Sequence, residues 1–402
     1  MRSQEKYIVT KEEVYGYAND WLATALRLEH TGYKCTSSVL FSILLIAAAR
    51  VVSVFAACRD LADAPSSRAV YKALLATLPH QRELQKRLNN CLCHNLPKAL
   101  FRKSRVVAID LTLIPYHGEP AFDPKEIFRG KPKSGTTHFH AYATAAVVHK
   151  GYRYTIALLY VEYGTSMKEV VQTLMQMIRR RCINVRYLLL DKGFYSVSVL
   201  SYLKRVRLGY IVPIILRGRK KKDPEAPVTG MRALLKKKNG HYSETIEGRD
   251  GNRRKARLKI KVCVASKDYE EEKTGKKHRK KLLFAISGVR RTWREIRELY
   301  RKRFGIETTY RQMNEARIKT CSRDPRIRLL FAGIALVLRN VWVWLHFRFA
   351  KNKYSEEPEL FLELLRFGEM LLWITEVVQK ALGADKTIGI DYETYQRLTA
   401  RY

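Results

Sequence analysis

The chain has 402 residues, enough for two or three domains and a sizeable buried core. Its apolar content of 46% is normal for a folded protein and argues against global disorder. Its charge is far from balanced, because 76 Lys and Arg stand against 38 Asp and Glu, a net charge of +38.

A soluble protein this basic repels itself unless an anionic partner neutralises it, and nucleic-acid phosphate is the usual partner. An anionic membrane surface is the alternative, but it favours one basic amphipathic helix. Here the cations are spread along the whole chain. The composition therefore predicts a nucleic-acid partner.

The seven cysteines show no disulfide-like spacing, and the first eleven residues are polar rather than a secretory signal. We therefore expect a reducing, cytoplasmic setting. Cys91, Cys93 and His94 resemble half of a zinc site, but no second Cys/His pair stands at ligand spacing. We do not expect zinc there.

Two apolar runs, 40–58 and 329–347, approach the length that spans a membrane. Arg50 interrupts the first run, and Arg339 with Asn340 interrupts the second. Because a charge near the middle of a span is costly in lipid, both runs are predicted to be buried helices. No membrane partner is expected.

Residues 1–100 are predicted to be a helical domain. Helical patterns over 11–30, 37–58 and 66–78 each follow or include a Ser or Thr that can act as N-cap. The short helices at about 66–78 and 81–96 could form a helix-turn-helix-like unit that binds DNA ends, although any small helical bundle has the same pattern. The sequence leaves both interpretations open.

From Arg105 the apolar residues follow the two-residue period of strands. Strands are predicted at 106–116, 139–149, 152–163, 186–190 and 210–215, with a hairpin turn at Lys150–Gly151 and helices at 166–181 and 196–206. Antiparallel strands followed by strands that alternate with helices predict a mixed α/β sheet covered by helices on both faces.

The segment 217–287 interrupts this pattern. Within 217–281 there are 23 Lys and Arg against 9 Asp and Glu, and strand-like runs occur at 256–265 and 281–287. Arg257, Lys259 and Lys261 alternate with apolar residues, which places cations on one face of a strand. We expect a basic, β-rich insertion that contacts phosphate.

A helix is predicted to begin near Trp293 and to run to Lys319, because Thr292 and Glu295 form a capping box. Polar residues recur at intervals of three and four along one stripe of it: Tyr300, Arg303, Glu307, Arg311 and Asn314. A solvated face with salt bridges is the simple explanation. A functional explanation is favoured because Glu307 is the single carboxylate among cations, on a helix that leads into an apolar run.

Three carboxylates, those of Asp110, Asp191 and Glu307, fall within a strand, at a strand end and on this helix. Each alone could be salt-bridged or act as a cap. Together they would repel one another unless a divalent cation neutralised them. A small set of hard oxygen ligands suits Mg²⁺ or Mn²⁺, which keep waters and take further ligands from phosphate. Two such ions support displacement at phosphorus.

Three runs resemble the catalytic blocks of the DDE transposases of prokaryotic insertion sequences, in the group with a Tyr-x2-Arg-x3-Glu-x6-Lys signature. They are VVAIDLTLIPYHG, LLLDKGFYS and YRKRFGIETTYR. The resemblance covers about residues 100–345. It implies a ribonuclease-H-like core at 101–216 and 288–350, with the insertion at 217–287. The residues from 326 onward have helical patterns, which predict a C-terminal helical region at 351–402.

The resemblance also implies roles for individual residues. Asp110, Asp191 and Glu307 would be catalytic ligands of two Mg²⁺ or Mn²⁺ ions, while Tyr300 and Arg303 would contact the transposon end. The signature lysine would fall at position 314, where this chain has Asn. Arg311 or Lys319 could replace it in binding DNA.

The expected function is a prokaryotic transposase that binds terminal inverted repeats as a homodimer, cleaves them by hydrolysis and joins the 3′ ends to target DNA. One alternative is a metal-dependent nuclease with the same core that performs no strand transfer. Another is a non-catalytic, basic nucleic-acid-binding protein whose acids only pair with Arg and Lys.

Overall fold

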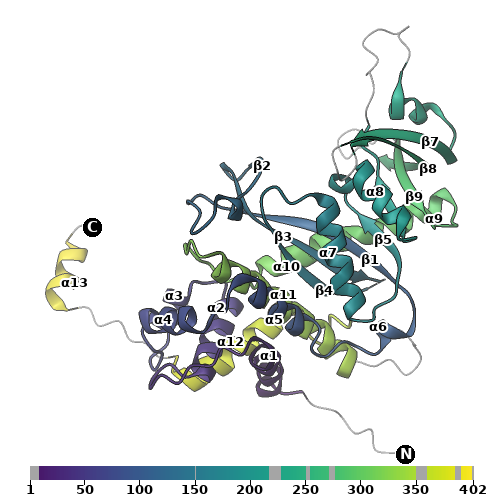
Figure 1. Cartoon of the computed structure of the whole chain (residues 1–402). Coiled ribbons are helices and arrows are strands. Elements are labelled where there is room, and N and C mark those ends of the chain that lie inside the picture. Colours follow the sequence, from purple (N-terminus) through teal and green to yellow (C-terminus); the bar gives the residue numbers. More distant parts are fainter. Residues whose placement is uncertain are drawn as a thin grey trace, which may run out of the picture.

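The computed structural model describes residues 9–149, 151–216, 228–249, 254–270, 277–349, 360–384 and 391–400. Within these residues nine strands form one mixed sheet with helices on both sides (Figure 1). The strands are β1 (Arg105–Pro115), β2 (Phe128–Lys133), β3 (Thr136–Val148), β4 (Arg153–Val161), β5 (Val185–Leu190), β6 (Gly209–Pro213), β7 (Gly240–Arg249), β8 (Lys255–Glu270) and β9 (Lys277–Ser287).

The centre of the sheet has the strand order β4-β3-β1-β5-β6. β1, β3 and β4 are antiparallel neighbours, whereas β5 runs parallel to β1 and β6 runs parallel to β5. The predicted hairpin joins β3 to β4, and Gly151 has the positive φ of +90° that such a turn favours. Lys150 lies outside the described residues. This succession corresponds to the ribonuclease-H-like core that the resemblance implies.

Alternate residues of β1 face two different apolar clusters. Val107 and Ile109 lie in the cluster that contains apolar residues of α7 (Met167–Arg180) and α8 (Val197–Arg205). Ala108 lies in the cluster that contains Ile296 of α9 (Trp293–Arg301) and Ile306 of α10 (Gly305–Asn314). Because strand side chains alternate, Asp110 lies on the same face as Ala108, toward α9 and α10.

The remaining helices form a layer beside β4, seen below the sheet in Figure 1. Its members are α1 (Lys11–Leu26), α2 (Ser37–Ala49), α3 (Val54–Arg59), α4 (Ser67–Thr77), α5 (Gln81–Leu92), α11 (Pro325–Phe349) and α12 (Phe367–Leu382). Two short helices, α6 (Ala99–Arg102) and α13 (Tyr392–Thr399), are not counted in this layer. α5 packs on α1, α11 and β4, so it is part of the core.

The helix α11 is, in the described part of the chain, the one that is long and apolar enough to cross a membrane. In its most apolar 18-residue window 94% of the residues are buried inside the protein, as expected of a core helix. Arg339 is buried and donates to the Arg153 carbonyl oxygen at 2.8 Å and to Oε1 of Gln312 at 3.0 Å. The arginine that argued against a membrane span is therefore satisfied by the fold.

The outer edge of β4 pairs with side-chain amides and not with another strand. Asn89 of α5 accepts from the Leu158 N–H at 2.9 Å and donates to the Leu158 carbonyl at 2.8 Å. Asn340 of α11 makes the same two-way contact with Thr155, at 3.0 and 2.7 Å. Gln85 accepts from the Tyr160 N–H at 2.7 Å. These carboxamides satisfy backbone groups that would otherwise be buried without partners, and they protect the edge.

The sequence-based prediction is wrong about one helix and misses two strands. The predicted helix 37–58 is two helices, because Val51 takes a left-handed φ of 53° and Ser53 then caps α3. The strands β2 and β7 were not predicted, since the FRGKPK and GHYSETIEGR runs are too polar to show a strand pattern.

The strands of the segment 217–287 continue the central sheet. β9 pairs with β6 through Tyr210 and Ser287, and β8 and β7 follow outward, at the upper end of Figure 1. Lys259 and Lys261 of β8 are exposed while Ile260 is buried, as the alternation predicts. The basic residues at 217–222 lie outside the described residues.

The amide pairing predicts a specific loss of stability. Asn89→Ala leaves the N–H and carbonyl of Leu158 without partners, which should lower the free energy of unfolding by about 1–3 kcal/mol. Asn95→Ala is the control, because Asn95 is exposed in the turn after α5. Urea unfolding measures both variants. Equal stability of Asn89→Ala and Asn95→Ala would show that the edge pairing contributes nothing.

Candidate active site

Two of the three carboxylates follow paired positions of neighbouring parallel strands. Ile109 of β1 pairs with Leu190 of β5, and the next residues along the chain are Asp110 and Asp191. The two side chains therefore start side by side. Asp191 is the first flanking residue of the 3₁₀ turn η2 (Lys192–Phe194) but makes no capping hydrogen bond. Its carboxylate remains free for another contact.

One guanidinium holds all three predicted carboxylates. Arg303 Nη1 lies 3.0 Å from Asp110 Oδ2, and Arg303 Nη2 lies 3.1 Å from Asp191 Oδ1 and 3.5 Å from Glu307 Oε1. The structure thus brings together residues 81 and 116 positions apart in the chain. Because one positive charge faces three carboxylates, the cluster has a surplus of negative charge.

The surplus is unusual for this chain, in which cations outnumber acids two to one. Among the described residues, Arg303 is the cation that forms ion pairs with these acids. The Arg303 side chain is 7% exposed and that of Asp110 is 13%, whereas Asp191 and Glu307 are 43% and 56% exposed. The cluster is therefore closed at Asp110 and open to solvent at the other two acids.

The helix that carries Arg303 and Glu307 is broken, contrary to the prediction of one helix over 293–319. It begins at Trp293 with the predicted capping box of Thr292 and Glu295, but α9 ends at Arg301. The 3₁₀ turn η4 (Lys302–Phe304) follows, and α10 ends at Asn314. A 3₁₀ turn rotates each residue by about 120° instead of 100°, so it changes the direction in which Arg303 points.

A close approach of backbone and side chain accompanies this break. At Gly305 a Cβ atom would stand 1.6 Å from Nε of Arg153, so the Arg153 side chain occupies the space that any other residue would need. Glycine at this position lets β4 and α10 approach each other. The sequence signal was a lone glycine inside a helical pattern.

Burial raises the pKa of Asp110 to about 6, although the Arg303 guanidinium and the Leu111 N–H both favour its charged form. The Leu111 N–H donates to Asp110 Oδ1 at 2.9 Å. Burial lowers the pKa of Arg303, but Tyr300, Asp110 and Asp191 outweigh it and leave that pKa above its ordinary value. The guanidinium therefore stays charged while Asp110 titrates near neutral pH.

Two tyrosines support the cluster. The Tyr300 hydroxyl donates to the Leu190 carbonyl at 3.3 Å and accepts from Arg303 Nε at 3.0 Å. The sequence did not identify the second, Tyr310, whose hydroxyl lies 3.0 Å from the Asp110 carbonyl and 2.8 Å from Thr144 Oγ1. Its position three residues after Glu307, on an adjacent helical row, was the available signal.

The other residues predicted to bind DNA stand apart from this cluster. Arg311 is exposed on α10, and its nearest hydrogen-bond partner is Thr308 Oγ1 at 3.5 Å. Lys319 lies beyond the end of α10, where its N–H donates to the Val52 carbonyl at 3.1 Å. Asn314 Oδ1 accepts from Arg317 Nε at 3.2 Å. Tyr300 and Arg303, by contrast, are buried.

The donor set fits a hard divalent cation, since it consists of three carboxylates with surplus negative charge. Across the described ranges, however, no three His, Cys, Asp or Glu side chains converge closely enough to hold a metal ion. Arg303 accounts for this, because the acids meet at its guanidinium. A metal ion bound by all three acids would require Arg303 to move.

Comparison with known proteins identifies a matching family, and the solved structures that match include a remote transposase. The family model described as "Transposase DDE domain" matches residues 101–340. Among curated proteins none matches the chain. A solved structure of the piggyBac transposase synaptic complex with hairpin DNA is 12% identical and has a TM-score of 0.49, covering 96% of this chain and 82% of that one.

The raised pKa of Asp110 predicts how stability changes with pH when metal is absent. Between the ordinary value of 3.8 and about 6 the folded protein holds a proton that the unfolded chain has released. This contribution to stability is therefore present at low pH and is lost as pH rises through about 6. Asp110→Asn cannot titrate there, so its stability relative to wild type should increase over that range.

Urea unfolding in EDTA at a series of pH values measures this difference. The other acids titrate in both proteins, so their contributions cancel in the difference between the free energies of unfolding of wild type and Asp110→Asn. A constant gap between wild type and Asp110→Asn from about pH 4 to about pH 7 would contradict the assignment.

Proposed function

The chain belongs to the transposase DDE domain family, and from this premise we propose that it moves an insertion sequence. Membership makes it an enzyme of DNA transposition that performs metal-dependent phosphoryl transfer. In our proposal it binds the terminal inverted repeats, cleaves them by hydrolysis and joins their 3′ ends to target DNA. The observation that carries the proposal is the meeting of Asp110, Asp191 and Glu307 at one guanidinium.

Asp110, Asp191 and Glu307 are proposed to hold two Mg²⁺ or Mn²⁺ ions. When bound, such ions activate the attacking hydroxyl and stabilise the leaving oxygen. The protein's own contribution is to fix the three acids: paired strands place Asp110 beside Asp191, and the first turn of α10 places Glu307 opposite them. Water and a 3′-hydroxyl can use the same site in turn, because only the nucleophile differs between cleavage and joining.

Arg303 is proposed to contact first the three acids and then a DNA phosphate. Before metal binds, its guanidinium neutralises part of the charge of the three acids and keeps them together. If divalent ions neutralised the acids instead, the Arg303 guanidinium would be free to meet a phosphate of the transposon end. Tyr300 is its partner in both states, because the two side chains are hydrogen-bonded one turn apart.

The exposed cations of α10 and of the segment 217–287 are proposed to hold the DNA. Arg311 is a candidate to replace the signature lysine, since it is exposed on the same helix as Glu307. Lys319 is exposed as well but lies outside α10. The exposed Arg257, Lys259 and Lys261 along β8 offer a row of charges to phosphates.

Assembly and location follow from the proposed reaction. An insertion sequence has two ends, so a homodimer with one active site for each end is the simplest assembly that synchronises their cleavage. We place the protein in the cytoplasm of a prokaryote, where the seven free cysteines would stay reduced.

Removing Arg303 tests its proposed role independently of catalysis. Arg303→Gln should lower the metal-free free energy of unfolding, because three carboxylates then lose their shared cation. It should also tighten Mn²⁺ binding by about tenfold, because the guanidinium no longer competes. Arg301→Gln is the matched control, since Arg301 is exposed and pairs with Glu298 at 2.9 Å. Calorimetric titration of DNA-free protein measures the affinity. Weaker or unchanged Mn²⁺ binding by Arg303→Gln would refute the competition.

Neutralising the acids one at a time tests the reaction. Asp110→Asn, Asp191→Asn and Glu307→Gln should each reduce metal-dependent cleavage of end-bearing DNA by about 10³-fold while leaving DNA binding intact. Glu315→Gln removes an exposed acid from the end of the same helix and should cleave normally. Cleavage that survives EDTA or all three substitutions would exclude this active site. Cleaved but unjoined DNA would favour the nuclease alternative.

A further inference from the structure

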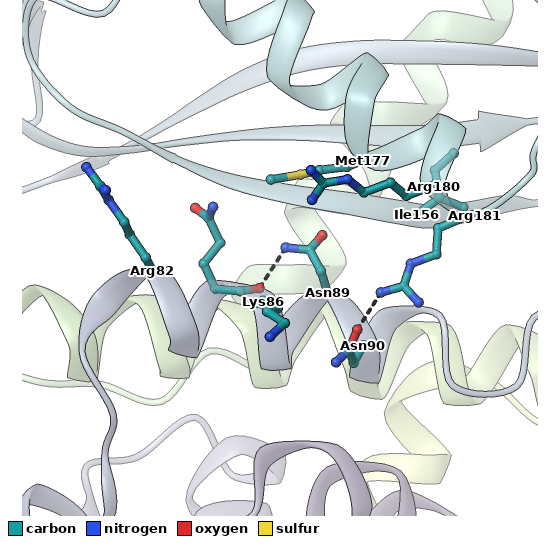
Figure 2. A pocket seen from close by; sticks show the side chains of 9 residues that line it. Arg82, Lys86, Asn89, Asn90, Ile156, Met177, Arg180 and Arg181 are labelled. Atoms are coloured by element: carbon teal, nitrogen blue, oxygen red, sulfur yellow. Dashed lines mark hydrogen bonds between the residues drawn. The ribbon is translucent and has the colours of Figure 1, made fainter.

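A basic groove runs between α5 and the β4–α7 part of the sheet (Figure 2). Its main hollow has a volume of about 430 Å³, and a second hollow of about 380 Å³ continues it toward the start of α5. Arg82 and Gln85 line both hollows. α5 has 12 residues, so the groove follows it for about 18 Å.

The groove has an apolar floor and a cationic rim. Ile156 of β4 and Met177 of α7 form the floor. The rim carries four cations, Arg82, Lys86, Arg180 and Arg181, without an acid among the residues that line the main hollow. Glu162 lines the second hollow, and Glu83 on α5 lies 3.4 Å from the Lys86 ammonium. The net charge of the residues at the rim is therefore strongly positive.

Two of the four cations have no partner among the residues that the structure describes. Arg82 and Arg180 are exposed and, within the described residues, make no hydrogen bond or ion pair. Arg181 is held in place by Asn90 Oδ1, 2.5 Å from its Nη2, as the dashed line in Figure 2 shows. A pair of unpaired guanidiniums that face a hollow leaves all their donors for an external anion.

The groove is separate from the carboxylate cluster. Ile156 and Met177 belong to or pack on the apolar cluster on the α7 side of the sheet. Asp110 lies on the opposite side, with Ala108 and α10. A ligand in the groove therefore cannot contact the three acids directly.

We propose that this groove binds the sugar–phosphate backbone of a DNA segment at a distance from the reacting bond. Phosphates would lie on the rim, and the less polar deoxyribose would lie over Ile156 and Met177. At about 3.4 Å per nucleotide the groove length corresponds to about five phosphates of one strand. The inference rests on the proposed function only in naming DNA as the anion.

The contact also gives the helical layer a role in the reaction. α5 precedes the family-matched residues 101–340, whereas β4 and α7 lie within them. Asn89 and Gln85, which dock α5 on the edge of β4, also line the groove. DNA bound there would contact both parts of the chain.

The test measures binding to a labelled DNA duplex of arbitrary sequence in EDTA, so neither cleavage nor end recognition is needed. The slope of log K against log salt falls by about 0.9 for each phosphate that the protein no longer neutralises. The double variant Arg82→Gln/Arg180→Gln should therefore have a slope lower by about 1.8. Arg82→Lys/Arg180→Lys keeps both charges and should retain the wild-type slope.

The control Arg27→Gln/Arg205→Gln removes two exposed arginines that do not line the groove, and its slope should be unchanged. A wild-type slope for Arg82→Gln/Arg180→Gln, or an equal drop in the control, would overturn the proposal. So would loss of polyglutamate binding by the groove variant with an intact DNA slope, because the partner would then be an acidic protein. If the protein bound DNA as expected but did not cleave it, the proposed function would be contradicted while the groove proposal would stand.

Discussion

The structure depends on one buried guanidinium shared among three carboxylates. Arg303 is almost fully buried, and a charge in that position is tolerated only when hydrogen-bonded partners surround it. β1, the residue that follows β5, and α10 each supply one of these partners, so the three elements are fixed relative to one another at this point. Because one guanidinium faces three carboxylates, the site has a surplus of negative charge. In the described part of the chain the three acids are gathered around this guanidinium and not around a space for a metal ion.

A second constraint acts at the opposite side of the sheet centre. β4 is an edge strand whose outer backbone groups are buried, and Asn89, Gln85 and Asn340 pair with them. This pairing makes the helical layer an integral part of the catalytic unit. It also borders the groove, two of whose rim arginines, Arg82 and Arg180, have no partner among the described residues. Thus one set of amide contacts both closes the sheet and shapes a surface that can bind an anion.

Local chemistry determined much of the fold from the sequence alone. The capping boxes at Ser166 and Thr292 fix helix starts, because each is complete within four residues. Alternation and β-branching identify the strands of the core, and an acid after an apolar strand run identifies Asp110 and Asp191 as unusual. The resemblance to DDE transposases, which the family match supports, rests on these same short runs.

Only the tertiary structure decided how these pieces meet. The sequence stripe of Tyr300, Arg303 and Glu307 assumed a continuous helix, whereas the 3₁₀ turn and the passage of Arg153 over Gly305 redirect the chain. The sequence assigned Arg303 to DNA and left pairing of the acids with Arg or Lys as an alternative. It did not indicate that one guanidinium would contact all three acids, nor that Tyr310 would lie close to Asp110. Periodicity and capping report interactions within a few residues, whereas these contacts join residues far apart in the chain. Their energies depend on burial, which exists only once the sheet and helices have assembled.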